Sequence, residues 1–102
     1  NGSDNTISGN LLADNLSPGV DLVAGIGTTV AGNVLVNNTI SGNSTLGSIE
    51  PFAIGVRSTG GTLGGQTIDR NIVTGNAGLG LFVEAGTAGI TITRNAFSNN
   101  GA

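Results

Sequence analysis

The ionisable residues are the first place to look for chemistry, and this chain has few of them. It contains no His and no Cys, so its serines have no imidazole to activate them as nucleophiles. The acids are Asp4, Asp14, Asp21, Glu50, Asp69 and Glu84, and the bases are Arg57, Arg70 and Arg94. We therefore expect no catalytic residues and no cofactor.

The best functional constellation is Asp69, Arg70 and Arg94. Arg70 and Arg94 each directly precede an Asn that begins a repeated motif, so we expect the two guanidinium groups to lie on successive layers of one surface. Paired guanidinium groups suit the geometry of a carboxylate or a sulfate. The alternative is a solvated surface on which Asp69 is the local counter-ion. By the same spacing argument, Glu84 and Arg57 are predicted to stack as an exposed ion pair.

The spacing of the acids argues against a metal site. Calcium ligands must converge to about 2.3–2.6 Å from the ion, and calcium-binding loops place Asp residues at regular short intervals. No stretch of this sequence has such intervals. We expect no bound metal.

Composition restricts the partners and predicts a folded chain. The net charge is −3, so a nucleic-acid backbone would meet few cations. Only 9% of the residues are charged and 37% are hydrophobic, which is unlike a disordered chain. The apolar runs are far shorter than the ~20 residues of a membrane span. We expect a single domain over residues 1–102, without nucleic-acid binding or a membrane span.

A repeated hexapeptide determines where the charged residues lie in the fold. NTISGN at 5–10 recurs at 38–43, and it returns as NIVTGN at 71–76 and NAFSNN at 95–100. The units therefore start near 5, 38, 71 and 95, at spacings of 33, 33 and 24 residues. Apolar columns are predicted at Ile7, Ile40, Val73 and Phe97, and at Leu35, Ile68 and Ile92. Gly and Asn at the end of each unit suit left-handed turns.

Each repeat has a second apolar segment with the alternation of a strand, around Val20, Ile54 and Leu81. The Gly- and Thr-rich stretches 25–32, 58–65 and 85–89 follow these segments and differ in length, as loops of a solenoid do. A helical repeat of 33 residues is the competing interpretation. The 19 Gly residues argue against it, since each costs about 1 kcal/mol inside a helix.

If each repeat is one coil, equivalent residues stack at about 4.8 Å and form columns. Asn side chains in such columns can hydrogen-bond from coil to coil, which avoids the cost of unpaired buried amides. The predicted structural ladders are Asn5, Asn38, Asn71 and Asn95, and Asn10, Asn43, Asn76 and Asn100. The fold class is all-β, a parallel β-helix of about three to four coils with uncapped ends.

The unit apolar-x-x-Asn-x-apolar-x-x-Asn resembles the right-handed parallel β-helix repeat of pectate-lyase-like proteins, and the resemblance covers nearly the whole chain. The family includes polysaccharide lyases, epimerases and bacterial surface proteins. An enzyme of this kind would act on acidic sugars with clustered acids and a proton-transferring base. The resemblance implies a right-handed coil and an extracellular or cell-surface location, but it is weak evidence for an activity.

Together these observations predict a non-catalytic structural module. It is expected to be a segment of a longer β-solenoid or a fibre subunit that stacks head to tail, its partner being itself or the rest of the solenoid. The alternative is a polysaccharide-binding or processing unit, related to lyases or epimerases, in which Arg70 and Arg94 face the sugar and Asp69 assists them.

Overall fold

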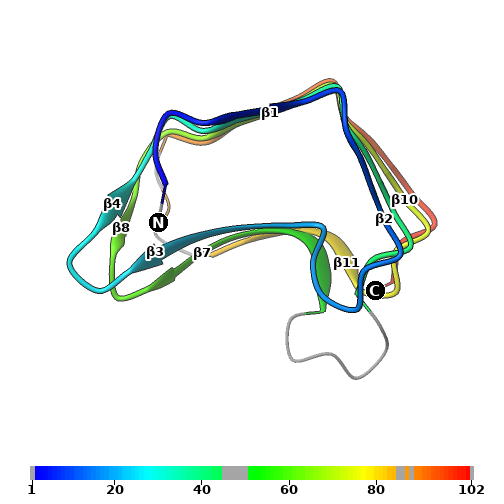
Figure 1. Cartoon of the computed structure of the whole chain (residues 1–102), viewed down its shortest axis with the longest axis horizontal. Helices are drawn as coiled ribbons and strands as arrows, with labels where there is room; N and C mark the ends of the chain where they lie inside the picture. Colours follow the sequence, from blue (N-terminus) through cyan, green and yellow to red (C-terminus); the bar gives the residue numbers. More distant parts are fainter. Residues whose placement is uncertain (1, 45–50, 85–86, 88, 102) are drawn as a thin grey trace.

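A computed structural model describes residues 2–44, 51–84, 87 and 89–101, and the described chain contains strands and turns but no helix. The described residues therefore include no helix that could cross a membrane. Viewed down its shortest axis, the chain winds through successive coils whose strands superimpose (Figure 1). All named strand pairs are parallel. The all-β, parallel β-helix prediction is confirmed.

Four sheets form the sides of the coils. Sheet A contains β1 (Thr6–Ser8), β5 (Val34–Val36), β9 (Thr67–Asp69) and β12 (Thr91–Thr93). Sheet B contains β2 (Leu11–Ala13), β6 (Thr39–Ser41), β10 (Ile72–Thr74) and β13 (Ala96–Ser98). Sheet C contains β3 (Val20–Gly25), β7 (Phe52–Thr59) and β11 (Leu79–Val83). The short sheet D contains β4 (Thr29–Val30) and β8 (Thr62–Leu63), within stretches that the sequence predicts only as loops.

The register of the first coil differs from the prediction. β1 pairs with β5 so that Ile7 lies beside Leu35, whereas Leu12 lies beside Ile40. The placement of Ile7 in one column with Ile40 was therefore wrong. The two identical hexapeptides run along different sides of the coil, because residues 5–10 join the corner before sheet A to the corner before sheet B. The ladder contacts join residues 28, 33 and 24 positions apart in successive coils.

The remaining apolar columns are confirmed. Leu35, Ile68 and Ile92 are neighbours in sheet A, and Ile40, Val73 and Phe97 are neighbours in sheet B. In sheet C, Val20, Ile54 and Leu81 align. Leu35, Ile40, Ile54, Ile68 and Val73 are fully buried in the core between the sheets. Small branched side chains thus fill most of the narrow interior.

Left-handed residues make the two short corners. The corner before sheet B has a positive φ at Gly9, Asn37, Arg70 and Arg94, and the corner after sheet B has one at Asp14, Gly42, Gly75 and Asn99. The sequence predicts the second corner from its Gly and Asn content. It does not predict that Arg70 and Arg94 are left-handed, a conformation that costs a residue with a Cβ about 1–2 kcal/mol.

Candidate functional site

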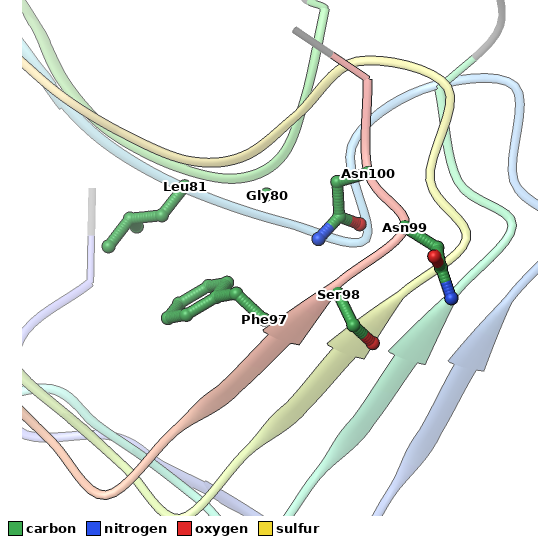
Figure 2. Close-up of a pocket in the computed structure, with 6 residues that line it drawn as sticks. All are labelled: Gly80, Leu81, Phe97, Ser98, Asn99 and Asn100. Carbon is green, nitrogen blue, oxygen red and sulfur yellow. The ribbon is translucent and has the colours of Figure 1, made fainter.

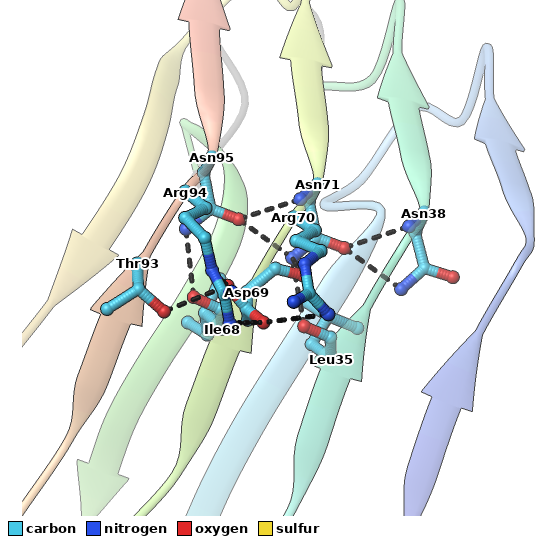
Figure 3. A network of polar contacts seen from close by, with 9 residues as sticks. All are labelled: Leu35, Asn38, Ile68, Asp69, Arg70, Asn71, Thr93, Arg94 and Asn95. Atoms are coloured by element: carbon cyan, nitrogen blue, oxygen red, sulfur yellow. Dashed lines mark hydrogen bonds and ion pairs between the residues drawn. The ribbon is translucent and has the colours of Figure 1, made fainter.

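Three polar ladders run along the corners of the stack, and two of them directly follow the left-handed residues of the short corners. In the middle ladder, the side chain of Asn71 accepts from the backbone N–H and Nδ2 of Asn38 at 3.0 and 3.1 Å. Its own Nδ2 donates to Oδ1 of Asn95 at 2.9 Å and to the carbonyl of Leu35 at 2.9 Å (Figure 3). Asn38 and Asn71 are buried. Each amide therefore satisfies both its own polar atoms and backbone groups of the adjacent coils.

All eight predicted ladder residues lie in ladders, but the first coil is assigned differently. Asn10, rather than Asn5, bonds Asn38. Asn15, rather than Asn10, bonds Asn43. The middle ladder is Asn10, Asn38, Asn71 and Asn95, and the last ladder is Asn15, Asn43, Asn76 and Asn100. The assignment of Asn5 and Asn10 to these two ladders was wrong by one corner.

Asn5 belongs to a third ladder that sequence reasoning missed. Its Nδ2 donates to Oδ1 of Asn33, and Nδ2 of Asn33 donates to Oε1 of Gln66. Gln66 is fully buried, and its Nε2 bonds the carbonyls of Val30 and Gly64. The signal was present in the apolar-x-x-Asn/Gln spacing from Val30 to Asn33 and from Leu63 to Gln66, but Gln66 does not match a search for Asn.

The ladders have a direction. In each inner step, the backbone N–H and Nδ2 of one Asn donate to Oδ1 of the Asn in the following coil. In the first coil, Oδ1 of Asn10 and Asn15 accepts no hydrogen bond from the described residues. In the last coil, the backbone N–H groups of Asn95 and Asn100 have no Oδ1 acceptor there. One end of the stack thus presents acceptors, and the other presents donors.

The predicted cluster of Asp69, Arg70 and Arg94 is present at the corner between sheets A and B. Nε and an Nη of Arg94 donate to the two carboxylate oxygens of Asp69 at 2.9 and 2.8 Å, and Thr93 adds a third hydrogen bond. An Nη of Arg70 lies 3.7 Å from the same carboxylate. Asp69 is buried, whereas both arginines are exposed. The hydrogen bond from Arg94 is the main reason that the pKa of Asp69 lies below its usual range.

This geometry separates the two arginines. Arg94 is committed to a bidentate pair with Asp69, which matches the counter-ion alternative. Arg70 makes a longer ion pair of 3.7 Å with this carboxylate, and its side chain makes no hydrogen bond to the described residues. The two guanidinium groups approach one carboxylate from successive coils (Figure 3). Of the pair, Arg70 has the greater freedom to contact an external anion.

The outer surface of sheet C carries a second charged group. Arg57 binds Asp21 through Nε and an Nη, with a shortest distance of 2.7 Å. Its guanidinium also lies 5.9 Å from the centre of the Phe52 ring, which stacks on Phe82. Val56 and Val83 align as the sequence predicts, and the carboxylate of Glu84 accepts from the backbone N–H of Ser58. A groove of about 370 Å³ adjoins these residues. The sequence did not predict the pairing with Asp21.

A metal site would need several ligating side chains close together within the described residues. No three His, Cys, Asp or Glu side chains gather there closely enough to hold an ion. The carboxylate of Asp69 accepts three hydrogen bonds from Arg94 and Thr93, so its charge is already paired within the protein.

Comparison with known proteins bears on the fold. Residues 1–97 match the family model described as "Right handed beta helix region". No curated protein and no solved structure gives a significant match. The match covers nearly the whole chain and agrees with the parallel sheets and polar ladders.

Proposed function

Because the chain belongs to the right-handed β-helix family, we propose that it is a structural β-solenoid module of an extracellular or cell-surface protein, extended by stacking of further coils. The observation that carries this proposal is the direction of the Asn ladders. The first coil presents the Oδ1 acceptors of Asn10 and Asn15, and the last coil presents the N–H donors of Asn95 and Asn100. Two such ends are complementary, so a second copy can continue both ladders.

The coil-to-coil pairing within the chain defines a register for the proposed contact. β1 of the following copy lies on β12, and β2 lies on β13, so that Asn95 bonds Asn10 and Asn100 bonds Asn15. Ile92 would then cover Ile7, and Phe97 would cover Leu12. Ile92 and Phe97 are each 42% exposed, so the contact buries apolar surface as well as pairing strand edges. Sheets A and B become continuous across the junction.

Sedimentation velocity over a range of concentrations tests this assembly. We expect the 102-residue chain to associate end to end, and we expect Asn10→Ala combined with Asn15→Ala to weaken the association at least tenfold. Ser41→Ala, on the lateral surface of sheet B, is the matched control and should leave it unchanged. A chain that stays monomeric at high concentration would contradict the proposal. Surface labelling of unpermeabilised cells with an antibody tests the location separately.

A second candidate function is polysaccharide binding through Arg70 and Arg94. The observation that favours it is the left-handed backbone of both residues, at φ values of 55° and 53°. Gly9 occupies the same column without this conformational cost, and strained residues with long side chains cluster at functional sites. A uronate or sulfate group would bridge the two guanidinium groups at the place where Asp69 now pairs with Arg94.

Glycan arrays and a lyase assay on uronate polymers test this second candidate. Selective binding that is lost in Arg70→Ala would support it and would overturn a purely structural role. Arg57→Ala, on the outer surface of sheet C, is the control for a general loss of positive charge. An absence of selective binding and of lyase activity would remove the candidate.

A further inference from the structure

Four Asn residues begin an Asn-x-Ser/Thr triplet, the acceptor sequence for N-linked glycosylation. They are Asn1, Asn15, Asn37 and Asn43. Asn1 and Thr45, the third residue of the Asn43 triplet, lie outside the described residues. Such triplets arise by chance in a chain this rich in Asn, Ser and Thr, so the surroundings of each Asn decide whether its amide can carry a sugar.

The ladders occupy two of these side chains. Nδ2 of Asn15 donates to Oδ1 of Asn43 at 2.7 Å, and Nδ2 of Asn43 donates to the carbonyl of Leu12 at 2.7 Å. Asn43 is also buried. Because Nδ2 is the atom that bonds to the sugar, a glycan on either residue would disrupt the ladder that joins the coils. The fold therefore disfavours a glycan on Asn15 or Asn43.

Asn37 has the opposite environment. It is exposed, and its side chain makes no hydrogen bond to the described residues. Its φ is 58°, and it directly precedes the ladder residue Asn38. Asn99 and Asn100 form the same kind of pair at another corner, and Figure 2 shows Asn100 turned to the side of Phe97 and Asn99 turned to the opposite side. A left-handed Asn that precedes a ladder Asn thus points away from the coil interior.

The neighbours of Asn37 leave room for a glycan. The N–H of Gly9 donates to the carbonyl of Val36, which makes Gly9 the neighbour of Asn37 in the preceding coil. A Cβ on Gly9 would meet no other atom within 4 Å, so this side of Asn37 is open. Thr39, the third residue of the triplet, lies on the outer face of sheet B beside the exposed Leu11, and its hydroxyl makes no hydrogen bond to the described residues.

We propose that Asn37 is the acceptor of an N-linked glycan. Nδ2 of Asn37 forms a bond to the anomeric carbon of an oligosaccharide that is carried on a lipid pyrophosphate. The bond from that carbon to the pyrophosphate oxygen breaks, the lipid pyrophosphate leaves with the electron pair, and the amide nitrogen loses one proton. The proposal rests on the extracellular location proposed above, since acceptor triplets are used at the surface of secreted proteins. A glycan on Asn37 leaves both ends of the stack uncovered, so it is compatible with end-to-end assembly.

Secretion of the 102-residue chain from eukaryotic cells tests the acceptor. Peptide mapping after treatment with peptide N-glycosidase, which converts each glycosylated Asn to Asp, identifies the modified residues. We expect a glycan on Asn37 and none on Asn15 or Asn43. Asn37→Gln and Thr39→Val should each remove the glycan, whereas the conservative Thr39→Ser should keep it. A secreted, folded chain with an unmodified Asn37, or equal modification of Asn15 and Asn37, would overturn the proposal.

Sedimentation velocity distinguishes the acceptor from the proposed function. The glycosylated chain should associate as strongly as the same chain after glycosidase treatment, because Asn37 lies on the lateral surface. Association that appears only after the glycan is removed would contradict this placement. If Asn37 stays unmodified in a secreted chain that associates end to end, the acceptor is refuted and the proposed function stands. If Asn37 is glycosylated in a chain that stays monomeric after glycosidase treatment, the assembly is refuted and the acceptor stands.

Discussion

Replacing Asn71 by Ala tests how much the ladders stabilise the coil. The side chain of Asn71 takes part in hydrogen bonds to Asn38, Asn95, Leu35 and the carbonyl of Asp69. Its loss leaves the buried N–H of Asn38 and the carbonyl of Leu35 without these partners. Asn38 keeps its Nδ2 bond to Ile7, and Asn95 still accepts from the backbone of residue 71. The buried N–H of Asn38 therefore becomes unsatisfied, and the carbonyls of Leu35 and Asp69 each lose one of their hydrogen bonds.

Each such buried group costs about 1–3 kcal/mol, so we expect Asn71→Ala to lower the free energy of unfolding by about 3 kcal/mol. For a domain of this size that corresponds to a fall in Tm of roughly 12–20 °C. Thermal and urea unfolding followed by circular dichroism measure both quantities. Asn10→Ala is the matched control, because Asn10 lies at the exposed end of the same ladder and should cost no more than about 1 kcal/mol. Equal losses in the two variants would refute the structural role of the inner ladder.

Three further predictions concern the corners, the core and the buried carboxylate. Gly75→Ala should cost about 1 kcal/mol in urea unfolding, because its φ is 66° while the added methyl meets no other atom. Ile68→Ala should cost about 3 kcal/mol and the exposed Ile72→Ala less than about 1 kcal/mol in the same assay. The hydrogen bond from Arg94 lowers the pKa of Asp69 in the folded state, so this carboxylate stabilises the fold above its unfolded pKa, 3.8, and the stabilisation is lost as pH falls through the lowered folded value. The stability difference between wild type and Asp69→Asn should therefore shrink as the pH falls below 3.8 towards the lowered folded pKa. A difference independent of pH would contradict the ion pair.

The fold follows from the sequence because short apolar alternations and turn residues recur in register. Leu35, Ile68 and Ile92 could be aligned from sequence since two residues separate each from the next motif Asn. The first coil could not be aligned in this way. Residues 5–10 and 38–43 are identical in sequence. Successive corners of the first two coils use a left-handed residue followed by an Asn, so the same hexapeptide fits either of two successive corners. Only the pairing of the flanking strands decides between them.

The sequence predicted which residues come together in the candidate site, but it did not predict how they pair. Equivalent positions in two motifs were enough to place Arg70 beside Arg94. Both arginines have a left-handed backbone, so the backbone conformation does not decide which of them pairs with Asp69. Asp69 lies beside Thr93 in sheet A, and this register brings the next residue, Arg94, onto its carboxylate. Neither Gln66 nor the pair of Arg57 with Asp21 follows from a repeat, because each depends on strand register between segments of different length.

Disulfide trapping tests the central claim, the register of the coils, most directly. The chain has no Cys of its own, and neighbouring residues on adjacent strands lie at about 4.8 Å, within the range of Cα separations that a disulfide spans. The structure pairs Leu11 with Thr39 and Thr6 with Val34. We expect Leu11→Cys with Thr39→Cys, and Thr6→Cys with Val34→Cys, to cross-link within the monomer on mild oxidation. Cross-linking of Thr6→Cys with Thr39→Cys in place of these pairs would show that the hexapeptides stack directly, and it would contradict the three-ladder arrangement.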